Sequence, residues 1–134
     1  MSRKNVEIVR RVMRCFADAN IDSALPLIHP QATLDWSNSN APDRGVYTGH
    51  AAWRAFLRAR NDALGERRFD SVELLTPADD TVVLIGRVQE RGRASGIEVE
   101  TRGAGVWTLR DGKIVHFKIY QSSDEALKAV GLEE

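Results

Sequence analysis

The sequence predicts an α+β fold in which helices come first and an antiparallel sheet follows. Up to about Leu64, apolar residues recur mostly at the spacing of an amphipathic helix. From Phe69 onwards they alternate with polar residues in four long runs, which is the period of a strand. This order is typical of α+β proteins. The 134 residues contain no internal repeat or linker-like tract, so we expect a single domain spanning residues 1–134.

Two helices are expected at the start of the chain. The first covers Lys4–Ala17, where apolar residues form one stripe and three arginines lie opposite. A shorter helix, capped by Asn20 or Asp22, should run to about Ile28, and Pro30 should close it.

A short strand and a loop are expected before the third helix. Ala32–Trp36 is the strand, and Ser37–Gly45 has the composition of a loop. The helix follows Gly49 and stops at Gly65. Its apolar face consists of Trp53, Phe56, Leu57 and Leu64.

The second half of the chain is predicted to be an antiparallel meander. Asp111–Gly112 between two apolar runs is a strong hairpin signal. Ser122 and Glu125 form a capping box that opens a last helix ending at Gly131. The four expected strands are Phe69–Thr76, Thr81–Arg91, Ile97–Arg110 and Ile114–Gln121.

Composition excludes several classes of protein. The 19 basic and 19 acidic residues balance, which argues against a general nucleic-acid binder. No apolar run reaches the roughly 18–20 residues of a membrane span, and the first residues lead into no signal-type segment. One cysteine, Cys15, cannot form an internal disulfide. We therefore expect a cytoplasmic protein with no nucleic-acid and no membrane partner.

Four segments, taken in order and at their separations, resemble one family. They are Asn5–Ser37, Gly45–Leu57, Gly96–Gln121 and Glu125–Leu132. Together they resemble the SnoaL-like group of the nuclear transport factor 2-like superfamily. The resemblance implies a cone-shaped, strongly curved sheet wrapped around the long helices, with an apolar cavity at the wide end. It also implies homodimers through the outer face of the sheet, for which Val106, Thr108 and Tyr120 are the expected contact residues.

The resemblance leaves the reaction open, because the superfamily includes steroid isomerases, polyketide cyclases, dehydratases, epoxide hydrolases and pocket proteins without known chemistry. Steroid isomerases use a general base on the first strand and two proton donors. The matching positions here are Val12, Trp36 and the vicinity of Gly105, and none of these can do that chemistry. We therefore do not expect an isomerase of that design.

Asp35 is the candidate catalytic residue, because it is the acid nearest to the position of the isomerase base. Strand alternation, however, places Leu34 and Trp36 on one face and Asp35 on the other. The alternative interpretation is a structural carboxylate that binds a loop backbone or an arginine such as Arg44.

A second acidic group lies on the third long strand. Epoxide hydrolase-like members need two carboxylates and an arginine inside the pocket, and Glu98, Glu100 and Arg102 share one strand face. The opposite face, which contains Trp107 and two glycines, is more apolar and should be concave. We therefore expect the three charged residues to lie outside in a cross-strand ladder.

The residues expected to line the apolar pocket are Trp36, Trp53, Trp107, Phe117, Ile119 and Gln121. The loop Ser37–Gly45 is placed as a lid, with Asn38 and Asn40 as further polar contacts. The alternative is that the rings fill the cone completely. No metal-ligand spacing and no phosphate-binding fingerprint is present, so no metal and no cofactor is expected.

Two functions remain open at this stage. The first is a binding protein for a small apolar molecule, without a catalytic constellation. The second is an enzyme of the polyketide cyclase, isomerase or hydratase/epoxide hydrolase type that uses Asp35 or another acid. A one-residue slip in strand register would exchange the two faces and favour the second.

Overall fold

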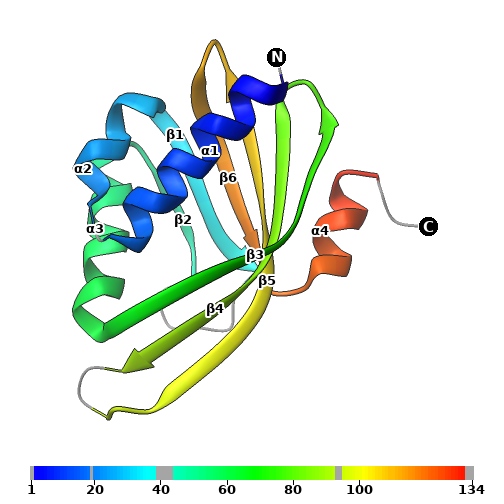
Figure 1. Ribbon diagram of the computed structural model, residues 1–134. Coiled ribbons are helices and arrows are strands. Elements are labelled where there is room, and N and C mark those ends of the chain that lie inside the picture. Colours follow the sequence, from blue (N-terminus) through cyan, green and yellow to red (C-terminus); the bar gives the residue numbers. More distant parts are fainter. Residues whose placement is uncertain (1, 19, 39–43, 93–94, 132–134) are drawn as a thin grey trace.

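A computed structural model describes residues 2–18, 20–38, 44–92 and 95–131. Its helices are α1 (Ser2–Ala17), α2 (Ile21–Ala24), α3 (His50–Ala63) and α4 (Ser123–Ala129), and a short 3-10 helix, η1 (Leu25–Leu27), follows α2. Its strands are β1 (Ile28–Asn38), β2 (Val46–Thr48), β3 (Leu64–Ala78), β4 (Thr81–Gly92), β5 (Glu98–Arg110) and β6 (Lys113–Tyr120) (Figure 1). The predicted α+β class is confirmed.

The six strands form one open sheet in the order β2-β1-β6-β5-β4-β3. The strands β3 to β6 form the expected antiparallel meander, and β2 pairs antiparallel with β1. The strands β1 and β6 run parallel. The prediction of an antiparallel sheet was therefore wrong for this pair of strands.

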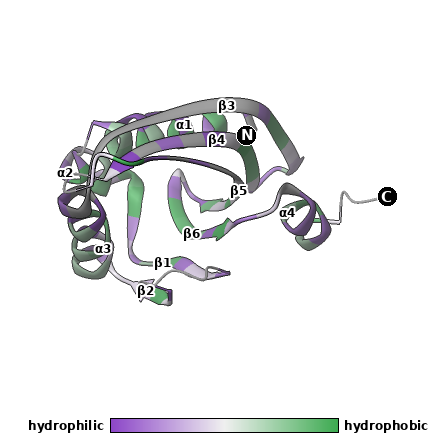
Figure 2. Ribbon diagram, turned by 90° about the horizontal axis from the view of Figure 1, so that it is seen from below, coloured by the Kyte–Doolittle hydropathy of each residue, from purple (hydrophilic) through white to green (hydrophobic). Residues whose placement is uncertain are grey.

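The sheet is strongly curved, and helices lie on both of its sides. Figure 2 shows the curve running from β3 round to β2, with α3 on the open side and α4 outside. We call these the concave and the convex side. The main apolar core fills the concave side, whereas a small cluster of Val83, Ala104, Val106 and Ala126 joins α4 to the convex side.

The helix α1 closes the concave side over β3 and β4. Ile8, Val9 and Val12 form its buried stripe, as the helical spacing predicted. Asn5 is also buried, and its Nδ2 donates a hydrogen bond of 2.7 Å to the Asp79 carbonyl in the turn between β3 and β4. This bond satisfies the amide and fixes one end of the helix to the sheet.

The second helix is shorter than predicted. It ends at Ala24, and Ile28 already begins β1, so Pro30 lies inside a strand and closes no helix. The reason is tertiary: Ile28 pairs with Ile114 of β6, and its carbonyl accepts a 2.7 Å hydrogen bond from His50 Nε2. These partners, distant in sequence, outweigh the local helical pattern.

Two further boundaries differ from the prediction. Leu64 begins β3, where it pairs with Gly92, and so does not belong to the face of α3. The edge strand β2 was not predicted, because three residues are too few to show an alternating pattern.

Local signals near the end of the chain were interpreted correctly. Asp111 and Gly112 adopt φ values of 52° and 78°, the left-handed conformations that a two-residue type I′ hairpin turn requires. The Ser122 hydroxyl accepts a hydrogen bond of 3.4 Å from the Glu125 N–H and so caps α4.

In the described part of the chain, no helix is long and apolar enough to cross a membrane.

Candidate functional site

Four aromatic side chains from four elements meet on the concave side. They are Phe16 of α1, Trp53 of α3, Trp107 of β5 and Phe117 of β6, and we call them the aromatic cluster. Phe117 stacks on Trp107, with ring centroids 3.6 Å apart and planes 8° apart. The Phe16 centroid lies 6.4, 6.1 and 6.5 Å from the centroids of Trp53, Trp107 and Phe117. These ring contacts join both long helices to the sheet.

The two buried tryptophans differ in how their indole N–H groups are satisfied. Both rings are fully buried. Trp53 Nε1 donates a hydrogen bond of 3.0 Å to the Ala32 carbonyl, which ties α3 to β1. Trp107 Nε1 is buried without a hydrogen-bond partner among the described residues. Such a donor costs about 1–3 kcal/mol relative to a satisfied one.

Gly105 lets the Phe117 ring pack closely against β5 next to the unpartnered N–H. A Cβ atom at this position would lie 3.2 Å from Trp107 Nε1 and 2.6 Å from Phe117 Cε1. At Gly103 the obstacle is backbone, because a Cβ would lie 2.5 Å from the Tyr120 carbonyl oxygen. Both glycines therefore permit a close approach, and at Gly105 the approaching group is the ring of Phe117.

The aromatic cluster is not closed on every side. Phe16, Trp36 and Ile119 pack against the buried core but remain partly exposed. The guanidinium carbon of Arg60, at the end of α3, lies 5.5 Å from the Trp36 ring centroid and 5.6 Å from that of Phe56. We call these three partly exposed apolar residues the rim of the concave core, and one of them, Trp36, has a cation beside it.

The strand β6 contains a bulge that simple alternation did not anticipate. Strict alternation along β6 would place Val115 on the inner face with Phe117 and Ile119, but Ile114 is the residue buried with Phe117 in the core. The pairing of β5 with β6 shifts by one residue, since Thr108 pairs with His116 and Leu109 with Ile114. Val115 is the extra residue, so it leaves the inner row.

Asp35 lies on the convex side of β1. Leu34, next to it, is fully buried in the concave core. The Asp35 carboxylate accepts hydrogen bonds from the Ser37 hydroxyl (2.5 Å) and the Ser37 backbone N–H (2.9 Å), and it lies 3.7 Å from Lys118 Nζ. The contact with the Ser37 backbone is of the kind that the structural alternative in the sequence analysis describes, although Ser37 belongs to β1 and not to a loop. Lys118 takes the place proposed for Arg44.

The environment of Asp35 keeps its carboxyl group ionised. Partial burial alone would raise the pKa, but the two Ser37 hydrogen bonds and the charges of Lys118 and His116 outweigh it, so the pKa falls below the usual 3.8. A carboxylate with a lowered pKa is a weak general base. Its position and its pKa therefore do not favour proton abstraction from a molecule on the concave side.

Glu98 and Glu100 of β5 also lie on the convex side. Glu98 forms an ion pair of 3.2 Å with Arg91, and Glu100 accepts a hydrogen bond of 3.1 Å from Gln89, both across the β4–β5 pair. The expected cross-strand ladder is thus present at these two positions, whereas the side chain of Arg102 lies outside the described part of the structure.

Comparison with known families agrees with this architecture. The sequence matches the model of the SnoaL-like domain over residues 9–117, well over half of the chain. The chain belongs to the SnoaL-like family. No curated protein sequence matches it significantly.

Solved structures share the fold of this SnoaL-like chain at low sequence identity. TerC, co-crystallised with polyporic acid, is 22% identical with a TM-score of 0.77, covering 96% of this chain and 98% of that one. A proposed polyketide cyclase from Xanthomonas campestris pv. campestris is 17% identical with a TM-score of 0.78, covering 96% and 98%. An NTF2-like protein from Burkholderia xenovorans LB400 is 19% identical with a TM-score of 0.78, covering 90% of each chain.

The predicted polar contacts of the SnoaL-like site are Gln121, Asn38 and Asn40, of which the structure describes the first two. The side chain of Gln121 is exposed, and its backbone N–H donates a hydrogen bond of 3.1 Å to Asn38 Oδ1, which links the ends of β1 and β6. Asn40 and most of the proposed lid, residues 39–43, lie outside the described residues.

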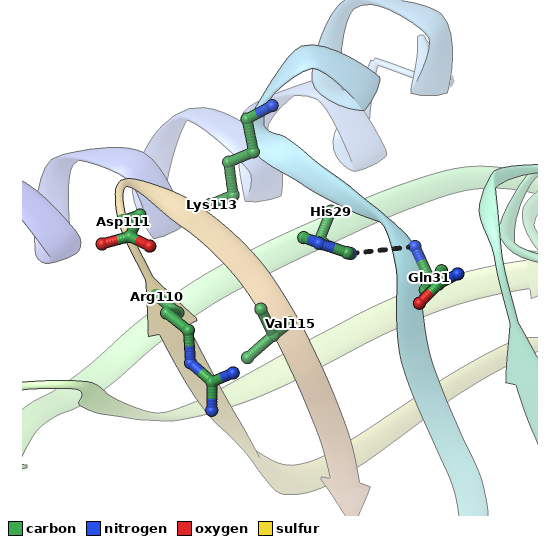
Figure 3. Close-up of a pocket in the computed structure, with 6 residues that line it drawn as sticks. All are labelled: His29, Gln31, Arg110, Asp111, Lys113 and Val115. Atoms are coloured by element: carbon green, nitrogen blue, oxygen red, sulfur yellow. Dashed lines mark hydrogen bonds between the residues drawn. The ribbon is translucent and has the colours of Figure 1, made fainter.

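A hollow elsewhere on the SnoaL-like domain is polar. It has a volume of about 450 Å³ and lies where the start of β1 meets the β5–β6 turn. Its lining consists of His29, Gln31, Arg110, Asp111, Lys113 and Val115. Figure 3 shows that Arg110 and Lys113 point in different directions, so the two cations do not converge on one ligand. None of the predicted pocket residues lines this hollow.

The described residues contain no group of three His, Cys, Asp or Glu side chains that could hold a metal ion. Cys15 is a half-buried free thiol packed against the core. The concave side therefore presents rings, aliphatic groups and one indole N–H, and this combination suits the binding of an apolar molecule.

Proposed function

We propose that this SnoaL-like protein binds a small apolar molecule against the aromatic cluster. The observation that carries the proposal is that the concave core has a rim. Phe16, Trp36 and Ile119 belong to the apolar core and yet remain partly exposed. Apolar side chains that line a concavity and reach solvent are typical of ligand sites.

The fold supports the same proposal. TerC, which has the same fold, was co-crystallised with polyporic acid. A flat apolar molecule could extend the stack that Phe117 and Trp107 begin, because aromatic rings prefer offset or tilted contacts of this kind.

The test is a binding titration that follows tryptophan fluorescence. Steroid-like, polyketide-like and terpene-like compounds, with polyporic acid as a further probe, should include at least one that quenches the fluorescence saturably. Trp36→Ala should weaken that binding without unfolding the protein, because Trp36 is at the rim and only partly buried. Val46→Ala, at an exposed residue of β2, is the matched control and should change nothing.

An absence of saturable quenching by every compound, at any soluble concentration, would contradict the proposal. So would binding that Trp36→Ala and Val46→Ala affect equally.

The alternative, an enzyme of the polyketide cyclase, isomerase or hydratase type, draws support from a neighbour proposed to be a polyketide cyclase. It has less support from the residues, since Asp35 is held by Ser37 and Lys118 away from the aromatic cluster. Turnover of a bound compound that Asp35→Asn abolishes would favour the enzyme over the binding protein.

We also propose a homodimer through the convex side. Val106 and Tyr120 pack in the small cluster with Ala126 of α4, so the contact would have to include α4 or the strand surface beside it. A monomer mass in light scattering at micromolar concentration would contradict this proposal.

A further inference from the structure

We infer that Trp107 Nε1 donates a hydrogen bond to a carbonyl oxygen of the bound molecule and so selects carbonyl-bearing ligands. The inference rests on the proposed function and adds the chemical class of the ligand. Trp107 is fully buried, and its N–H has no acceptor among the described residues. Buried indole N–H groups normally have a partner, so this one calls for a group that the described residues do not supply.

Comparison with Trp53 shows that the fold can satisfy an indole in this environment. Trp53 is equally buried, belongs to the same cluster, and donates to the Ala32 carbonyl at 3.0 Å. Trp53 thus has a structural bond that helps to hold α3 on β1. Trp107 lies on β5, in the interior of the sheet, and its N–H has no acceptor among the described residues. This N–H can therefore donate to another molecule.

Gly105 places open backbone beside the free donor. A Cβ at Gly105 would lie 3.2 Å from Trp107 Nε1, so its absence leaves the donor uncovered by a side chain from this position. The Phe117 ring packs there instead, with Cε1 2.6 Å from where that Cβ would be. A ligand oxygen that accepts from the N–H therefore requires the Phe117 ring to move aside, and the ligand would take over part of its stacking on Trp107.

The surroundings favour a neutral acceptor. The core around Trp107 is formed by apolar side chains, so an anionic oxygen would be buried without a counter-charge at high cost. A hydroxyl group would bring a second donor that itself needs an acceptor. A ketone or quinone carbonyl brings an acceptor alone, and this is the group that a single N–H satisfies.

The experiment uses 1-tetralone and tetralin, two bicyclic probes that differ in one carbonyl group. Their affinities are measured by ¹H–¹⁵N NMR titration of the three indole N–H signals, assigned with single Trp→Phe variants. With 1-tetralone, the Trp107 N–H signal should move downfield, whereas tetralin should leave it nearly unchanged. The Trp53 signal should respond to neither, because its N–H is already bonded.

The ratio of the two dissociation constants isolates the hydrogen bond. In Trp107→Phe the preference for 1-tetralone over tetralin should fall about 3- to 10-fold relative to the unmodified protein. In Trp53→Phe, the matched control, the preference should stay the same. Because Trp107→Phe could disturb the packing, Gly105→Ala gives a second test: its methyl group would lie 3.2 Å from Trp107 Nε1, would crowd the approach of a ligand oxygen and should also remove the preference.

The outcomes separate the two proposals. Equal affinity changes for both probes in Trp107→Phe would overturn the carbonyl inference and would fit a water molecule bound at the N–H. Binding of other panel compounds without any binding of 1-tetralone would overturn it as well, while the proposed function would stand. If no compound of either set binds, the proposed function fails, and this inference fails with it.

Discussion

The two sides of the sheet differ in the kind of contact that holds them. On the concave side, rings from four elements exclude water, and one donor, Trp107 Nε1, has no partner in the described part of the chain. On the convex side, Asp35 lies beside Lys118 and Glu98 beside Arg91, and both pairs keep contact with solvent. Stability should therefore depend on the concave side far more than on the convex side, and so should ligand recognition.

The largest expected effect is that of Trp107→Ala. Removing a fully buried indole loses its transfer free energy and leaves a cavity, which should lower the free energy of unfolding by about 3–5 kcal/mol. Chemical denaturation monitored by circular dichroism measures the loss. A variant that keeps its full stability would show that Trp107 is exposed and that the two faces are assigned the wrong way round.

Gly105→Ala should have the next largest effect on the concave side. The added Cβ would lie 2.6 Å from Phe117 Cε1, so the stacked ring must move, at a cost of about 1–3 kcal/mol. Thermal unfolding measures it. Gly96→Ala, where a Cβ meets no atom within 4 Å, separates crowding from backbone effects, because its cost comes only from its φ of 68°. An equal loss in both variants would argue against crowding at Gly105.

Asp35→Asn tests the convex side and should cost about 1 kcal/mol or less, because asparagine keeps an acceptor for Ser37 and loses only the charge. The folded pKa of Asp35 lies below its unfolded value. Its contribution to stability is therefore present above the unfolded pKa near 3.8 and is lost as pH falls through the lower folded pKa. Unfolding curves of both proteins should differ near neutral pH and converge in acid. A constant difference at every pH would rule out the charge as the cause.

The smallest effect is expected for Arg91→Ala, which removes the ion pair with Glu98. Both side chains are largely exposed, 51% and 73%, so the pair should contribute about 0–0.5 kcal/mol and less in high salt. Denaturation at low and high ionic strength measures it. A loss comparable to that of Gly105→Ala would remove the contrast between the two sides.

The sequence was sufficient to predict the features that depend on short-range patterns. Helical spacing gave the buried stripe of α1, and alternation gave the inward face of β5 and the outward position of Glu98 and Glu100. Asp111–Gly112 predicted its turn because the conformation it needs is encoded in two adjacent residues.

The features that were missed depend on partners far away in the chain. Ile28 is a strand residue because His50 and Ile114 hold it there. Val115 leaves the inner row because the pairing of β6 with β5 shifts beside it. The free donor of Trp107 could not be recognised for the same reason: whether an indole has an acceptor depends on which carbonyl other elements bring near, as α3 and β1 do for Trp53.

The order of strands has a consequence for how the chain is made. The strands β1 and β2 join the rest of the sheet through β6, which comes last in sequence among the six strands. Until residues 113–120 have emerged, the nascent chain carries β1 with one of its two edges unpaired, and the aromatic rings contributed by α1 and α3 lack Phe117. Pairing the first long strand with the last closes a loop of most of the chain, which makes assembly of the concave side a late event and favours slow folding. During translation, the concave surface is thus the one most exposed to aggregation and most in need of a chaperone.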